Sequence, residues 1–144
     1  MEYMEALREI YADYARDVEA LEKTRKPTEG MLGIGRKPGD DPCHDKFFSR
    51  VGAVTEEMAG ADLEDGELAG IMDMVLTEEK RTALPSYAHW MLLAVHRHLI
   101  PLIPRLTPKE AGRLLEGYAA AYPRFKRLPI QKDVIKALQK AAGK

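Results

Sequence analysis

The chain has a single cysteine and no long hydrophobic run, and each shortage excludes a class of protein. Cys43 is the only cysteine in 144 residues, which excludes an internal disulfide, a Cys-x-x-Cys redox pair and a multi-cysteine structural zinc site. The longest apolar stretch, residues 87–103, is interrupted by histidines, Arg97 and Pro101, so it falls short of a membrane span. The chain opens on an acidic segment that does not resemble a signal peptide, so we expect a cytoplasmic protein.

Long segments lack charge of one sign, although the net charge of the whole chain is only −1. Residues 56–79 carry nine acidic residues and no basic one, whereas residues 123–144 carry seven basic residues against Asp133 alone. Either the basic tail docks on the acidic body, or it offers a basic face to an external polyanion. We favour docking on the body, because the isoelectric point near 6.4 falls well short of that of a strongly basic nucleic-acid binder.

Apolar periodicity predicts an all-α fold, organised as a single domain over residues 1–144. A chain of this length with 45% hydrophobic residues can bury a core without metals or disulfides. Apolar residues recur at spacings of three and four, and no segment alternates as a strand would. We predict a bundle of about six helices with one long Gly/Pro-rich loop at residues 26–41. The helices are expected over residues 2–25, 42–59 and 85–100, and from starts near residues 62–65, 108 and 129.

Capping and breaking residues mark the helix boundaries. Asp41 and Thr107 each precede a proline, and both side chains can accept bonds from unpaired N–H groups of a first helical turn. Glu110 follows Thr107 by three residues, which predicts a reciprocal capping box. Pro101 and Pro104 are expected to break or kink the fourth helix.

Two helices carry apolar patterns with a further meaning. The first has a heptad seam of alternating three- and four-residue spacings, which suits an antiparallel helix pair, a homodimer or a protein partner bound through this helix. The fourth is apolar nearly all round, as expected at the centre of a bundle, so we place Trp90 in the core.

The long loop and the helix start that follows it are the only part of the sequence that hints at chemistry. The loop lacks the Gly-Lys-Ser/Thr ending of a P-loop, and no strand precedes it, so it is not a phosphate cradle of known type. Arg36 and Lys37 are candidates for binding an acidic ligand, although solvated loop charges are the alternative.

Cys43 lies next to His44 in the first turn of the second helix, where a thiol can become nucleophilic or bind a metal. Asp41 opposes a second negative charge there, and Cys43 shares a helix face with Phe47, which favours a buried structural thiol. No His-x-x-x-His or Glu-x-x-His motif occurs, so a divalent metal would have to be held across helices. The candidate metal ligands are Asp40, Asp41, Cys43 and His44, together with His89 or His96.

The absence of a complete catalytic constellation predicts a cytoplasmic, non-enzymatic helical binding or interaction domain. One alternative is a small metal- or thiol-dependent enzyme or sensor with its site at the start of the second helix, facing the fourth helix. Another is nucleic-acid binding by the basic residues 124–144, against which the acidic body argues. No membrane association is expected.

Overall fold

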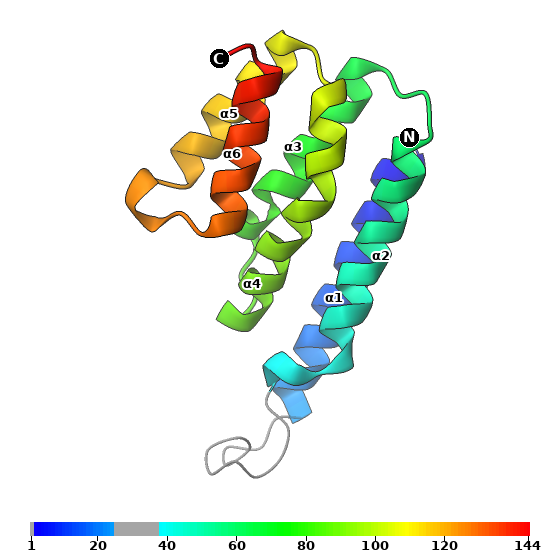
Figure 1. Cartoon of the computed structure of the whole chain (residues 1–144). Helices are drawn as coiled ribbons and strands as arrows, with labels where there is room; N and C mark the ends of the chain where they lie inside the picture. Colours follow the sequence, from blue (N-terminus) through cyan, green and yellow to red (C-terminus); the bar gives the residue numbers. More distant parts are fainter. Residues whose placement is uncertain (1, 25–37) are drawn as a thin grey trace.

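The computed structural model describes residues 2–24 and 38–144. Within these residues the chain is helical and contains no strand, which confirms the predicted all-α bundle of six helices (Figure 1). The predicted loop lies outside the described residues as far as residue 37. The helices are α1 (Glu2–Thr24), α2 (Pro42–Ala59), α3 (Asp65–Arg81), α4 (Ser86–Ala94), α5 (Pro108–Ala121) and α6 (Pro129–Ala141), and the 3₁₀ segments are η1 (Pro38–Asp40), η2 (Val95–Arg105) and η3 (Arg124–Lys126).

Two antiparallel helix pairs flank a central segment. α1 packs along α2, α5 packs along α6, and η2 lies between the pairs in contact with both α2 and α6 (Figure 1). The heptad seam of α1 is buried inside this arrangement, with Leu7, Tyr14 and Val18 almost fully covered. The side of α1 that the sequence marks for a partner is therefore used within the fold, and a partner or second copy at α1 stays a prediction.

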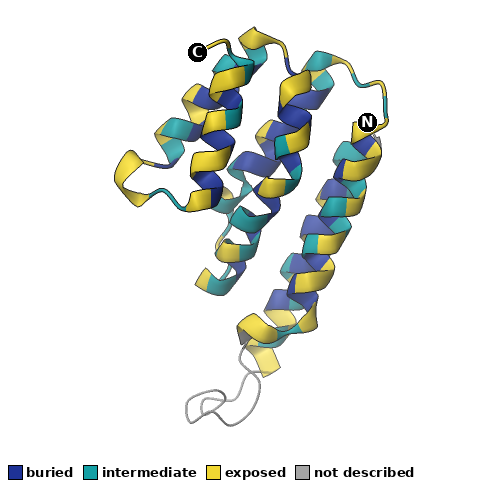
Figure 2. Ribbon diagram, in the orientation of Figure 1, coloured by how far each residue is buried: buried dark blue, intermediate teal, exposed yellow. Residues whose placement is uncertain are grey.

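The fourth predicted helix changes its geometry partway along. It is α-helical only as far as Ala94 and continues as the 3₁₀ helix η2, which runs through Pro101 and Pro104 where a break was predicted. A proline has no N–H to donate and its ring crowds the preceding turn of an α-helix, so the tighter 3₁₀ geometry accommodates the two prolines. Their three-residue spacing places both on the exposed side of η2, while Leu99 and Ile103 are buried (Figure 2).

Side-chain hydrogen bonds cap the first turns of α2 and α5, and a further bond joins the start of α5 to α3. Asp41 caps α2 as predicted, accepting a bond of 2.9 Å from the Cys43 N–H. Thr107 caps α5 through a 3.4 Å bond from the Glu110 N–H, but the reciprocal half of the predicted box is absent. The Thr107 N–H instead donates to the Asp65 carboxylate at 2.8 Å, so a contact between helices replaces the local one.

Gly52 on α2 lets the centre of the bundle close. The His98 ring of η2 packs against Phe48 and donates from Nε2 to the Phe48 carbonyl at 3.1 Å, which holds the ring beside Gly52. A Cβ atom at position 52 would lie 2.8 Å from His98 Cε1, closer than a non-bonded carbon contact allows. Glycine is therefore required by the close approach of two helices and not by its backbone angles.

Gly52→Ala is expected to destabilise the protein by about 1–3 kcal/mol, because the pinned imidazole has to shift. Gly117→Ala is the matched control, since nothing lies within 4 Å of a Cβ at that α5 position. Removing a helical glycine there is expected to stabilise the fold by roughly 0.5–1 kcal/mol. Urea unfolding measures both variants, and equal effects of the two substitutions would contradict the packing argument.

Candidate functional site

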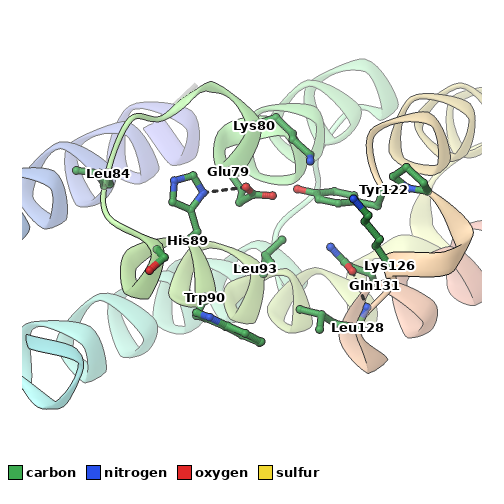
Figure 3. A pocket seen from close by; sticks show the side chains of 12 residues that line it. Glu79, Lys80, Leu84, His89, Trp90, Leu93, Tyr122, Lys126, Leu128 and Gln131 are labelled. Carbon is green, nitrogen blue, oxygen red and sulfur yellow. Dashed lines mark hydrogen bonds and ion pairs between the residues drawn. The ribbon is translucent and has the colours of Figure 1, made fainter. Parts of the chain in front are cut away.

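A pocket of about 510 Å³ opens between the end of α3, the start of α4 and the η3–α6 segment (Figure 3). The short connection between α3 and α4 turns the chain back on itself, so that residues ten positions apart in sequence face each other across the pocket. Its apolar walls come mainly from leucines of α4 and of the connections. Its polar groups are Glu79, Lys80, Ser86, His89, Lys126 and Gln131, with the ring and hydroxyl of Tyr122.

Glu79 and His89 form a pair of polar side chains in the pocket. His89 Nδ1 lies 2.8 Å from Glu79 Oε2. Burial raises the pKa of the Glu79 carboxyl, but the interactions with His89 and Tyr122 and the Lys80 charge outweigh burial, and the pKa falls below its usual value. Glu79 is therefore ionised at neutral pH, which makes it the acceptor and His89 Nδ1 the donor.

Tyr122 separates Glu79 from the basic end of the pocket. Its side chain is only 5% exposed, and its hydroxyl faces Glu79 without reaching hydrogen-bond geometry (Figure 3). Burial, followed by the interaction of the hydroxyl with the Glu79 carboxylate, raises the pKa of Tyr122, so the hydroxyl stays protonated. The Lys80 ammonium lies 4.8 Å from the ring centroid in a cation–π contact, and its charge also lowers the pKa of Glu79.

Trp90 corrects the sequence-based prediction, because it is 61% exposed and lies at the pocket. α4 has only nine residues and buries mainly Ala88 and Leu92, so its remaining faces stay open. Phe125, in η3 between the pocket residues Pro123 and Lys126, is 98% exposed. Among the described residues, these two are the only exposed large hydrophobic side chains. The one sequence signal for Phe125 is its position between basic residues.

The predicted thiol site is largely buried. Cys43 is 9% exposed, its Sγ lies 4.0 Å from His44 Nδ1, and it lines a second pocket of about 440 Å³ with Asp41 and Lys46. Burial, followed by the Asp41 carboxylate, raises the pKa of the Cys43 thiol to about 12. His44 is also buried, with Nδ1 2.7 Å from the Tyr14 hydroxyl.

The candidate metal ligands do not form one cluster. Asp41, Cys43 and His44 come together, and Asp40 precedes them in η1, whereas His89 pairs with Glu79 and the fully buried His96 bonds the Tyr118 hydroxyl at 3.0 Å. In residues 2–24 and 38–144, no group of three or more His, Cys, Asp or Glu side chains is arranged to hold a metal ion. Metal binding stays a prediction without geometric support. Arg36 and Lys37 lie outside the described residues.

Comparison with known proteins assigns the chain to no family. The chain matches no protein-family model, no curated protein and no solved structure. None of the helices that the structure describes is long and apolar enough to cross a membrane. Function has to be argued from the pocket and its surroundings.

The Cys43 thiol is expected to react slowly in the native protein. With its pKa raised to about 12, the thiolate fraction at neutral pH falls roughly a thousandfold, and labelling by a disulfide reagent slows by at least about tenfold, because the higher nucleophilicity of such a thiolate offsets part of the loss. The same chain unfolded in urea is the control and should label at the rate of a free cysteine. Rapid stoichiometric labelling in native buffer would instead favour the thiol-dependent alternative.

The buried His96 is expected to make the folded protein less stable as the pH falls from 6.5 to 4. Burial lowers its pKa from 6.5 to about 4, so between these values the unfolded chain takes up a proton that the folded chain refuses. This linkage costs the folded state about 3 kcal/mol over that interval. His96→Gln keeps a polar partner for Tyr118 and removes the titration. Its stability relative to the native chain should rise as the pH falls from 6.5 to 4, and a constant difference in urea unfolding would refute the assignment.

Proposed function

We propose that this chain is a non-enzymatic interaction domain that binds an acidic segment of a partner protein at the pocket between α3, α4 and α6. The observation that carries the proposal is the exposed Trp90 in the lining of a pocket whose two lysines, Lys80 and Lys126, form no ion pair with a described residue. The other exposed large aromatic residue of the described structure, Phe125, is the chain neighbour of Lys126. An apolar anchor flanked by acidic residues is the complementary ligand.

The aromatic residues supply the apolar part of the interface. Exposed tryptophan and phenylalanine beside a concave pocket are typical of binding hot spots, because their desolvation stabilises a complex more than that of most residues. Trp90 forms part of the pocket wall, whereas Phe125 lies outside the lining, in η3 next to the lining residue Lys126. A partner side chain entering the pocket would cover Trp90.

The basic residues supply the charge complementarity. Lys80 and Lys126 lie in the pocket lining, and the lysines of α6 lie outside it on the exposed side of that helix. Glu78 and Glu79 of the acidic segment pair with Arg81 and His89, and neither forms an ion pair with a described basic residue of 123–144. The interpretation in which the tail neutralises the acidic body therefore lacks support, and an external acidic partner is the better account.

One observation favours a second candidate, single-stranded nucleic acid. Phe125 is flanked by Arg124 and Lys126, and an exposed aromatic ring among basic residues is suited to stacking on a base. The ionised Glu79 inside the pocket and the acidic segment 56–79 oppose a polyanion, so we rank this candidate below an acidic peptide.

Trp90 is the only tryptophan, so its fluorescence reports binding at the pocket directly. The probes are short synthetic peptides with a central leucine or phenylalanine flanked by glutamates, and matched peptides flanked by lysines. We expect a saturable blue shift with the acidic peptides only, because Trp90 loses water contact. Lys126→Glu should weaken binding about tenfold by reversing a charge at the pocket, whereas Lys136→Glu, on α6 outside the pocket, should have a smaller effect.

Three outcomes would contradict the proposal. Equal binding of both peptide classes would remove the charge argument. A salt-sensitive shift with oligothymidylate but not with peptides would favour the nucleic-acid candidate. A shift that grows with protein concentration alone would indicate that the acidic face of a second copy is the occupant.

A further inference from the structure

We infer that the end of the pocket around Tyr122 is an oxyanion subsite, which takes a carboxylate or phosphate group attached to an apolar or aromatic group that packs on Trp90. The inference rests on the proposed function in one respect, since it names the chemical group of the partner that enters the pocket. It is carried by four donor side chains from three parts of the chain.

Lys80 and Lys126 supply two positive charges at this end. The Lys80 ammonium is held over the Tyr122 ring, and the Lys126 side chain reaches toward the same ring from η3 (Figure 3). Both side chains are exposed, and neither forms an ion pair in the described structure. Two ammonium groups directed at one place repel each other, and an anion between them removes that repulsion.

Tyr122 and Gln131 supply neutral donors at the base of the subsite. The Tyr122 hydroxyl is buried in the pocket wall and faces the Glu79 carboxylate without full hydrogen-bond geometry, so an oxyanion on the lysine side competes with Glu79 for its proton. Gln131 is buried as well. Its amide oxygen accepts a 2.7 Å bond from the Leu128 N–H, which turns the amide nitrogen, a donor, into the pocket (Figure 3).

Glu79 is the one acidic side chain in the pocket lining, and it limits where the anion can lie. Its carboxylate is bonded to His89 at the opposite end, on the far side of the Tyr122 hydroxyl from Lys126 (Figure 3). The lining therefore carries one negative and two positive charges, and Lys80 lies near enough to Glu79 for its charge to act on that carboxylate. An oxyanion is favoured beside Lys126 and Gln131, on the side away from Glu79, which orients the ligand with its apolar part along Trp90 and Leu93.

Small aryl anions test the subsite without a peptide. The probes are phenyl phosphate, benzoate and the neutral benzyl alcohol, titrated into the full chain and followed by proton–nitrogen NMR. We expect saturable shifts of the Trp90 indole signal and of the backbone signals of Lys80, Lys126 and Gln131 for the two anions. Phenyl phosphate should bind more tightly than benzoate because it carries more charge, and benzyl alcohol at least about tenfold more weakly than either.

Three variants and one control separate the donors from general charge. Lys80→Met and Lys126→Met remove an ammonium and keep most of the apolar stem, and each should weaken phenyl phosphate binding roughly fivefold. Lys136→Met, outside the pocket, should leave it unchanged. Tyr122→Phe is the most selective variant. Because its hydroxyl faces Glu79 without full hydrogen-bond geometry, its loss should change the urea midpoint little, yet weaken anion binding about threefold.

The failures of the two proposals are distinguishable. Aryl anions that bind at Lys80 and Lys126 while acidic peptides do not would uphold the subsite and refute the peptide partner. Acidic peptides whose affinity is unaffected by Lys80→Met, Lys126→Met and Tyr122→Phe would uphold the partner and refute the subsite. Shifts confined to residues 132–144, equal binding of benzyl alcohol, or no binding of either anion would each overturn the subsite.

Discussion

The fold depends on burying a proline-containing helix at its centre. η2 cannot complete the hydrogen bonds of an α-helix at Pro101 and Pro104, and it resolves the conflict by tightening to 3₁₀ geometry with both prolines facing outward. Its buried face then supports α2 on one side and α6 on the other. Gly52 and His98 show how closely α2 approaches, since the ring occupies the place of a side chain.

The same change of geometry positions the pocket. Because the α-helical part ends at Ala94, α4 is too short to be enclosed, and it stands at the edge of the bundle with Trp90 outward and His89 toward α3. η3 and the start of α6 close the other side. The pocket is thus formed where the short helix α4 leaves a gap that its neighbours do not cover. Lys80 and Lys126 in its lining carry the positive charges that the proposed binding of an acidic partner requires.

The histidines and the cysteine illustrate how burial decides chemistry. Cys43, His44 and His96 are all buried, and each lies within bonding distance of a neighbouring side chain. Burial raises the pKa of the Cys43 thiol and lowers the pKa of His96, and both shifts favour the neutral form of the side chain. His89 differs from them, because it is partly exposed in a pocket and bonded to a carboxylate. The polar pair on which the proposed site depends therefore lies at the end of α3 and the start of α4, far along the chain from the Gly/Pro-rich loop.

The sequence by itself determined the all-α class, most helix limits and the burial of Cys43, because capping residues and apolar spacing act within a few residues of each other. The cap on α2 at Asp41 and the buried face of α6 are of this local kind. Only the tertiary structure decided that Thr107 bonds Asp65 instead of completing its own capping box, that Trp90 is exposed, and that Glu79, His89, Lys80 and Tyr122 share a pocket. Those outcomes depend on which helices meet and on how far each extends into the bundle. Periodicity along one helix cannot specify either, because an apolar face is the same sequence pattern whether a neighbour covers it or leaves it open.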